Sequence, residues 1–277
     1  MRVAIISDLH GNTFALEAIL EDVAKAGVDE IVIAGDSVNI HPNSKTCWDM
    51  VLELGYVVLQ GNHEQYMYRV GTPDASSEWN EPRFQMIRYF HAQFSSSDLE
   101  EMRALPLTYH LPDLLICHAT PRDTFKTLTK KTSSLELEAL FSGTHEPFIV
   151  RGHNHNWFSL QWNGRNLWSI DAAGLPLSGN TQAAYAILTR HNTWQLEQRF
   201  VSYDHAAALK VMNDAYIAGV GALGHILRLE LATAGPHLVP FFLQYGLVLE
   251  AGTVTLEDAV QRFIADPSLE KLKVKIL

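Results

Sequence analysis

The sequence predicts an α/β protein, because short apolar runs alternate with longer amphipathic ones. The apolar runs near the N-terminus are RVAIIS, EIVIAG and YVVLQG, and each has the length and composition of a buried strand. Between them lie LEAILEDVAKAG and SKTCWDMVLELG, which have helical spacing of apolar residues and end at Gly27 and Gly55. A regular alternation of strand and helix builds a sheet that is covered by helices.

The remainder of the chain divides into a strand-rich part and a helical part. Residues 64–105 are predicted to be helical, and strands return with TYHL, LLICHA and, after the helix SSLELEALFSG, with PFIVRG. The run FSLQWNGRNLWSIDAAG predicts a hairpin with an Asn-Gly turn, and AAYAILTR and TWQLEQRFV predict the last strand pair. Helices broken by Gly and Pro follow from about His205. We therefore predict a first domain over residues 1–204 and a helical extension over residues 205–277.

Composition and charge exclude several classes of function. The 277 residues carry 31 acidic and 21 basic side chains, for a net charge of -10, which argues against binding extended nucleic acid. No apolar segment approaches the length of a membrane span, so we expect no membrane association. The two cysteines, Cys47 and Cys117, cannot form a disulfide framework and indicate a reducing compartment. We expect a cytoplasmic protein.

Residue types that bind metals follow several predicted strands, at the point where each strand ends. They are Asp8, His10, Asp36, Asn62, His63, His118, His153 and His155. Sites in open α/β sheets collect at the carboxyl ends of strands, so we expect these side chains to converge. Each motif alone is common in ordinary turns, whereas the coincidence of all of them predicts a metal centre. Carboxylates with imidazoles suit Mn, Fe, Zn or Ni, and one bridging carboxylate would let the set hold two ions.

The motifs D-x-H, G-D, G-N-H-E, H and G-H-x-H occur here in this order. In this the chain resembles the calcineurin-like metallophosphoesterases, and most of all their small prokaryotic phosphoesterases and phosphodiesterases. The likeness extends through RALPLTYHLPDLLICHATP and SIDAAGLPLSGNTQAAYAIL and spans roughly residues 1 to 200. It implies a four-layer α/β/β/α sandwich of two mixed sheets flanked by helices, with a helical C-terminal extension.

The resemblance also implies a binuclear centre and a role for each motif residue. One ion would bind Asp8, His10 and His155, the other would bind Asn62, His118 and His153, and Asp36 would bridge them. Two cations about 3.5–4 Å apart activate a bridging hydroxide for in-line attack at phosphorus. We expect two manganese ions, with iron, zinc or nickel as alternatives. His63 would lie beside the ions and protonate the leaving oxygen, so His63 and Asp36 are the expected catalytic residues.

The sequence departs from the protein phosphatases of this superfamily where those enzymes grip phosphate. Ile40 and Gln60 stand where those phosphatases have arginines. A bidentate arginine is the usual partner of a phosphate dianion, so its absence favours diesters, which carry one charge fewer. Asn39 replaces the aspartate that orients the proton donor in those enzymes. His41 and Arg122 are further candidates for substrate contact, although a plain loop histidine and a solvated surface arginine are the simpler interpretations.

We therefore predict a phosphoester hydrolase that acts on a small phosphoester or nucleotide, with phosphodiesters preferred. The alternatives are a nucleotide or protein phosphatase on the same centre, or a non-catalytic scaffold with the same fold. A scaffold would be expected to have lost ligands that this sequence retains. The apolar segments of residues 205–277 either cap the first domain or form a homodimer through the C-terminal helices.

Overall fold

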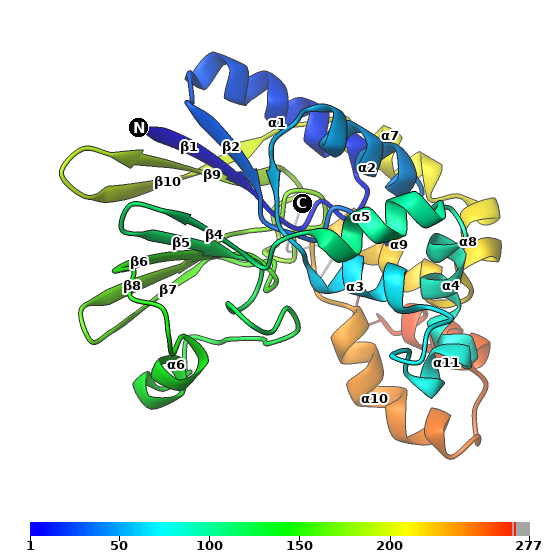
Figure 1. Ribbon diagram of the computed structural model, residues 1–277. Coiled ribbons are helices and arrows are strands. Elements are labelled where there is room, and N and C mark those ends of the chain that lie inside the picture. Colours follow the sequence, from blue (N-terminus) through cyan, green and yellow to red (C-terminus); the bar gives the residue numbers. More distant parts are fainter. Residues whose placement is uncertain (268, 270–277) are drawn as a thin grey trace.

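The computed structural model describes residues 1–267 and 269 and contains two five-stranded sheets between layers of helices (Figure 1). The strand orders are β10-β9-β1-β2-β3 and β4-β5-β6-β8-β7. In Figure 1 the first sheet lies above the second, helix α1 (Thr13–Ala26) covers the first sheet, and helix α6 (Ser134–Leu140) lies below the second. The predicted four-layer sandwich is confirmed.

The first sheet is mixed, because parallel strands at one side meet an antiparallel pair at the other. Its strands are β1 (Arg2–Ile6), β2 (Glu30–Ile33), β3 (Val57–Val58), β9 (Ala183–Arg190) and β10 (Trp194–Val201). Side chains of β1 alternate between the two faces. Ala4 and Ile6 pack in the cluster under α1, whereas Val3 and Ile5 pack in the cluster between the sheets. Both faces of β1 are therefore buried, which explains its continuous apolar run.

The second sheet is also mixed. Its strands are β4 (Thr108–Leu111), β5 (Leu114–Cys117), β6 (Phe148–Arg151), β7 (Phe158–Trp162) and β8 (Arg165–Ser169). β5, β6 and β8 are parallel, and β4 and β7 pair antiparallel at the two edges. The predicted hairpin is present as β7 and β8, and its turn residues Asn163 and Gly164 have φ angles of 46° and 77°. Positive φ at both turn residues is what a tight hairpin favours.

The segments between strands are helical where the sequence predicts helices. They are α2 (Ser44–Glu53), α3 (Asn62–Arg69), the short 3₁₀ turns η1 (Ser77–Asn80) and η2 (Pro82–Phe84), α4 (Gln85–His91) and α5 (Ser96–Ala104). Cys47 in α2 and Cys117 in β5 are both free and buried. Across the described residues, no helix combines the length and the apolar character that crossing a membrane requires.

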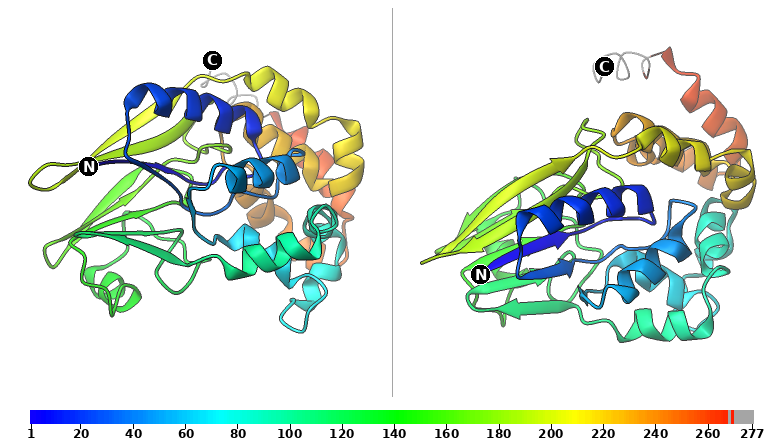
Figure 2. Two further views of the ribbon diagram at one scale, coloured as in Figure 1. Left: turned by 45° about the horizontal axis from the view of Figure 1, so that its top comes forward. Right: turned by 90° about the horizontal axis from the view of Figure 1, so that it is seen from above.

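The chain changes from strands to helices after β10, as the sequence predicts. The helices are α7 (His205–Val211), α8 (Asp214–Val220), α9 (Leu223–Thr233), α10 (Leu238–Glu250) and α11 (Leu256–Ile264). In both views of Figure 2 they gather at the end of the sheets away from the N-terminus. The separation into two domains at residue 204 stays a prediction.

The C-terminal helices share a hydrophobic cluster with the α/β part of the chain. Met212, Tyr216 and Leu227 pack in one cluster with Trp48 and Phe90. The Tyr216 hydroxyl, which is buried, donates a hydrogen bond of 2.6 Å to the carbonyl of Ile40, in the loop after β2. These helices therefore cap the α/β part, which is the first of the two alternatives.

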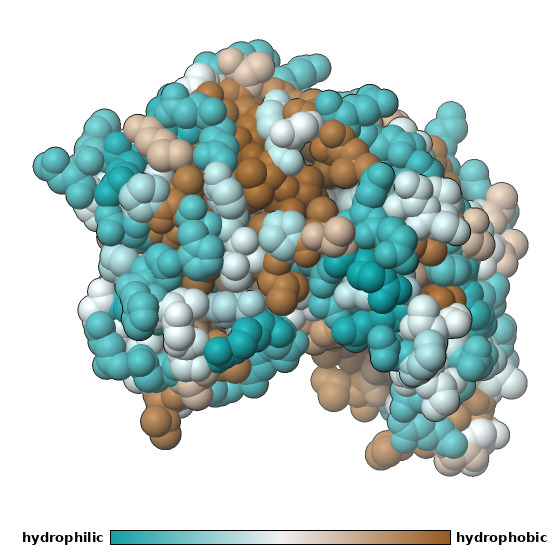
Figure 3. Space-filling model, in the orientation of Figure 1, coloured by the Kyte–Doolittle hydropathy of each residue, from teal (hydrophilic) through white to brown (hydrophobic). Residues whose placement is uncertain are grey.

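Helix α10 leaves an apolar stripe in solvent. Val239, Leu243 and Leu247 are 65%, 84% and 83% exposed, and their spacing places them on one side of the helix. Figure 3 shows the molecule hollowed at its lower edge, between the part that carries α6 and the part that carries α10. A homodimer through the C-terminal helices stays a prediction.

We expect Tyr216→Phe to lower the free energy of unfolding by about 1–3 kcal/mol, because the buried Ile40 carbonyl loses its partner. Urea denaturation followed by circular dichroism measures the effect. The control is Tyr56→Phe, since Tyr56 is half-buried and its hydroxyl makes no hydrogen bond within the described residues. An equal loss in both variants would contradict the assignment.

Candidate metal centre

The structure brings the predicted ligands together where β1, β2, β5 and β6 end and α3 begins. Three groups of side chains have ligating atoms within 4.8 Å of one another: Asp8, His10 and His155; His10, Asp36 and His63; and Asp36, His118 and His153. The Asn62 side-chain amide joins these groups, 3.0 Å from His118 Nε2 and 2.9 Å from His153 Nδ1. Asp36 and His10 each belong to two groups, so the groups form one continuous cluster.

The backbone reaches this arrangement through unusual local conformations. Asp8, His10, Asp36, His153 and His155 have φ angles of 57°, 48°, 55°, 69° and 53°, in the left-handed region that disfavours side chains. Such conformations persist only where the surroundings hold them, and they cluster at functional sites. Here the His10 amide donates to the Asp36 carbonyl at 2.8 Å, which ties the loops after β1 and β2 together.

A glycine allows the loop after β6 to approach the loop after β1. A Cβ atom on Gly152 would lie 1.9 Å from Ser7 Oγ and 2.5 Å from the Asp8 carboxylate. The His153 amide then donates to Asp8 Oδ2 at 3.0 Å. Any larger residue at position 152 would move the two ligand loops apart.

Backbone carbonyls orient the histidine rings. His118 Nδ1 contacts the Ala34 carbonyl at 2.9 Å, His155 Nδ1 contacts the Leu175 carbonyl at 2.7 Å, and His153 Nε2 contacts the Phe125 carbonyl at 3.1 Å. A carbonyl only accepts, so each of these nitrogens carries a proton, and the other ring nitrogen faces the cluster, where it can bind a cation when the ring is neutral. Histidines that ligate metals in proteins are usually held in this way.

The cluster concentrates negative charge in a buried place. Burial by itself would raise the pKa of Asp8 and Asp36, but the neighbouring histidines outweigh it, so the pKa of both carboxyls lies below the ordinary value. Burial would lower the pKa of His118, but the Asp36 carboxylate raises it to about 9. Within the described residues, the ion pairs of Asp8 and Asp36 involve only histidines. Ionised carboxylates, imidazole nitrogens and an amide that converge in this way are a donor set that fits divalent cations.

Glu64 holds the loops together, and our sequence interpretation missed it. Its carboxylate is buried and accepts from the amides of Asp36, Ser37 and Gly61, at 3.0, 2.6 and 2.8 Å. Gly61 is the N-cap of α3 and Glu64 is the third helical residue, so the contact follows a capping-box pattern. The signal in the sequence is a Gly followed three residues later by Glu at the start of a helix.

Arg151 is a second residue that the sequence interpretation missed. Its guanidinium is buried and donates to the carbonyls of Ala119 and Lys126, at 2.6 and 3.1 Å, and to the side chain of Asn154. It therefore ties the loop after β5 to the loop after β6. The sequence does contain a signal for this role, because Arg151 ends the apolar run PFIVR of a predicted buried strand. A charge at such a place needs several hydrogen-bond partners.

The three expected substrate contacts differ in their surroundings, and substrate contact by each stays a prediction. His41 is buried, and its two ring nitrogens contact the carbonyls of Gly11 and Ala208. Asn39 is also buried and its side-chain oxygen accepts from the Ile40 amide, without a hydrogen bond to His63. Arg122 is exposed and donates to Ser142 Oγ at 2.5 Å.

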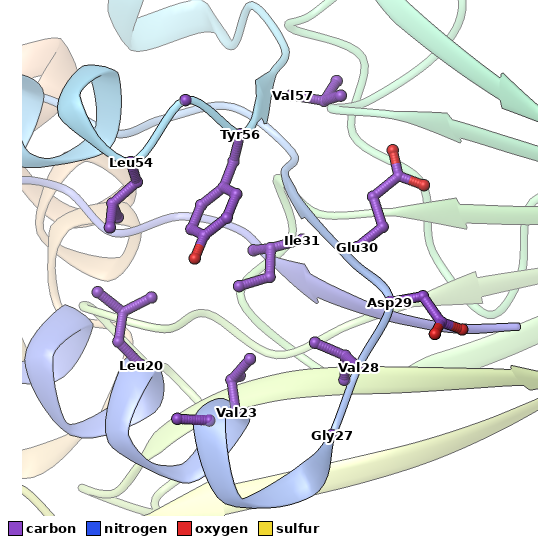
Figure 4. A pocket seen from close by; sticks show the side chains of 12 residues that line it. Leu20, Val23, Gly27, Val28, Asp29, Glu30, Ile31, Leu54, Tyr56 and Val57 are labelled. Carbon is purple, nitrogen blue, oxygen red and sulfur yellow. The ribbon is translucent and has the colours of Figure 1, made fainter.

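A cavity of about 430 Å³ lies away from this cluster (Figure 4). It is lined by residues of α1, β2 and the segment before β3, mostly apolar, among them Leu20, Val23, Ile31, Leu54 and Tyr56. None of the predicted metal ligands lines it. The predicted metal centre therefore lies outside this cavity.

Comparisons with known proteins identify the class. The model of the calcineurin-like phosphoesterase family matches residues 1–196, and the chain belongs to this family of metal-dependent phosphoester hydrolases. A crystal structure of a metallophosphoesterase from Sphaerobacter thermophilus is similar with a TM-score of 0.68 and 25% identity, over 84% of this chain and all of that chain (100%).

Two further relatives are archaeal. The structure of the hypothetical protein PH1004 from Pyrococcus horikoshii OT3 shares the fold, with a TM-score of 0.68 and 15% identity over 84% of this chain and 98% of that chain. The uncharacterized protein MJ0912 of Methanocaldococcus jannaschii is 27% identical over 124 residues, which are 43% of this chain. That match spans half (50%) of the relative's own length.

We expect Glu64→Gln to lower the free energy of unfolding by about 1–3 kcal/mol and to weaken metal binding, because an amide nitrogen would face backbone donors. Calorimetry measures both effects. The control is Glu101→Gln, an exposed glutamate on α5 with no recorded side-chain partner among the described residues. Unchanged metal affinity in Glu64→Gln would refute the role assigned to Glu64.

Proposed function

We propose that this protein hydrolyses phosphoesters with two divalent cations, manganese first, and prefers diesters to monoesters. The observation that carries the proposal is the orientation of the histidines. His118, His153 and His155 each bind a backbone carbonyl through one nitrogen and direct the other at buried carboxylates and at the Asn62 amide. Ligand nitrogens fixed in this way toward carboxylates are a donor set suited to divalent cations.

The residues divide into two sets of ligands around a shared carboxylate. Asp8, His10 and His155 would hold one cation, Asn62, His118 and His153 would hold the other, and Asp36 belongs between them. Cations bound there supply Lewis acidity toward a phosphoryl oxygen and make water nucleophilic near neutral pH. The retention of the whole set favours an enzyme over a non-catalytic scaffold.

We assign proton donation to the leaving oxygen to His63, and its surroundings support this role. Its Nε2 atom lies 3.9 Å from Asp36 Oδ2, and its ring contacts the His10 ring edge-on with centroids 4.5 Å apart. The side chain is 15% exposed, so the ring lies between the buried ligands and solvent. The His63 amide donates to Asp36 Oδ1 at 2.8 Å, which sets the start of α3 against the cluster.

The surroundings of the cluster favour a substrate of low charge. Gln60 is buried, and its side-chain amide donates to the Met102 carbonyl at 2.9 Å, so it does not replace a phosphate-binding arginine. Ile40 is buried and apolar. A small phosphodiester or a nucleotide ester therefore fits better than a phosphoprotein, and a nucleotide or protein phosphatase remains the alternative reaction on the same centre.

We expect Asp36→Asn to abolish metal-dependent turnover while the protein stays folded. The loss should exceed the roughly 10- to 100-fold that removal of an outer partner of a ligand costs. The protein is stripped with chelator, restored separately with Mn, Fe(II), Ni, Zn or Mg, and assayed on p-nitrophenyl phosphate and bis-p-nitrophenyl phosphate. Asp74→Asn, in an exposed loop, is the control. Absence of turnover with every metal in the unchanged protein would refute the proposal.

We expect His63→Asn to slow poor leaving groups more than good ones, because a proton donor contributes roughly 10²–10⁴-fold where the leaving oxygen needs a proton. The measurement compares kcat/KM for p-nitrophenyl and phenyl diesters of equal charge. His191→Asn, at an exposed turn, serves as the control. An equal loss on both esters would show that His63 does not protonate the leaving group.

A further inference from the structure

Three aromatic side chains from separate segments meet beside the cluster. Tyr66 comes from α3, Trp79 from η1, and Phe125 from the loop between β5 and α6, and we call these residues the aromatic wall. The Tyr66 ring lies 5.3 Å from the Trp79 ring and 5.4 Å from the Phe125 ring, centroid to centroid, with interplanar angles of 74° and 80°. Tyr66 is thus the centre of the wall.

The wall is attached to both sides of the metal cluster. Tyr66 follows His63 by three residues on α3, and the two rings are edge-on at 5.4 Å. His63 in turn contacts His10. On the other side, the Phe125 carbonyl accepts from His153 Nε2 at 3.1 Å, and the Phe125 amide donates to Asp123 Oδ1 at 2.8 Å. Phe125 is therefore held in place next to the cluster.

The aromatic wall has a solvent-exposed ring and two polar groups without hydrogen bonds among the described residues. Phe125 is 38% exposed, although it adjoins a buried cluster. The Tyr66 hydroxyl and the Trp79 indole nitrogen make no hydrogen bond within the described residues. Phe125 thus presents ring surface to solvent beside the cluster, next to the Tyr66 and Trp79 rings.

Two of the charged groups near the wall are paired with carboxylates, and the Arg88 guanidinium donates to the Trp79 and Glu81 carbonyls. Arg83 lies 2.8 Å from Glu81, and Lys126, next to Phe125, lies 2.9 Å from Glu136. The pKa of Tyr66 is raised, mainly by burial and to a smaller extent by the negative charge of Asp36. Its hydroxyl therefore stays protonated and can donate a hydrogen bond. The wall therefore offers ring faces and neutral donors rather than positive charge.

We propose that the aromatic wall binds a planar aromatic group of the phosphoester, a nucleobase or an aryl group, while the phosphoryl group lies at the cluster. The inference rests on the proposed phosphoesterase function and adds a substrate class to it. Stacking on an aromatic side chain suits any base or aryl ring, because each has a π-face, and it adds affinity without adding charge.

Calorimetric titration of the manganese-loaded protein tests the proposal without turnover. The paired ligands are phenyl phosphate against methyl phosphate, and adenosine 5′-monophosphate against ribose 5-phosphate. We expect the aromatic member of a pair to bind about tenfold more tightly, and Phe125→Ala to reduce that preference to about twofold or less. Phe200→Ala is the matched control, because Phe200 on β10 is 42% exposed and outside the wall. Phe125→Leu repeats the test with an apolar side chain that has no ring.

The outcomes separate this proposal from the proposed function. A preference for phenyl phosphate alone identifies an aryl group, and a preference for the nucleotide alone identifies a nucleobase. Three results would overturn the proposal that the aromatic wall binds a ring of the substrate. They are equal affinities within both pairs, no binding of any of these phosphates, and a preference that persists in both Phe125 variants. Turnover of bis-p-nitrophenyl phosphate with equal affinities would leave the hydrolase intact and remove only its aromatic specificity.

Discussion

Burial of two carboxylates between two sheets is the constraint on which the rest of this structure depends. Asp8 and Asp36 lie at strand ends where almost no water reaches them, and their ion-pair partners among the described residues are histidines. A buried negative charge is stable only with a counter-charge and hydrogen bonds. The loops around the cluster supply the hydrogen bonds, and the histidines supply counter-charge where they are protonated. The same carboxylates and imidazoles form groups that could hold metal ions, in keeping with the metal dependence of the family.

The same constraint explains the unusual backbone around the site. Side chains can converge from several strands only if the loops turn sharply, and left-handed residues such as Asp8 and His153 accomplish this. Glu64 and Arg151 hold the turned loops, the first by accepting from three amides and the second by donating to two carbonyls of the loop after β5 and to the Asn154 side chain of the loop after β6. The ligands are thus positioned from behind by buried charged groups that do not enter the cluster.

The regions around the cluster determine what can bind there. The C-terminal helices bury His41 and the loop after β2, through the Tyr216 hydroxyl and the Ala208 carbonyl, and close that side of the centre. Tyr66, Trp79 and Phe125 meet beside the cluster through His63. The candidate metal centre thus has a side closed by the C-terminal helices and an aromatic group next to it.

The sequence by itself determined the strands, the helices and the positions of the ligand residues, because these depend on local periodicity and on motifs at strand ends. The sandwich needed the resemblance as well, and the change to helices after β10 was visible as a change of pattern. The tertiary structure decided which polar residues face the cluster. His41 and His118 look alike in the sequence, as histidines in loops. In the structure, His41 hydrogen-bonds to the Ala208 carbonyl of a distant helix, whereas His118 faces Asp36. Glu64, Arg151 and the aromatic wall were missed for the same reason, since their partners lie far away in the chain or on other elements.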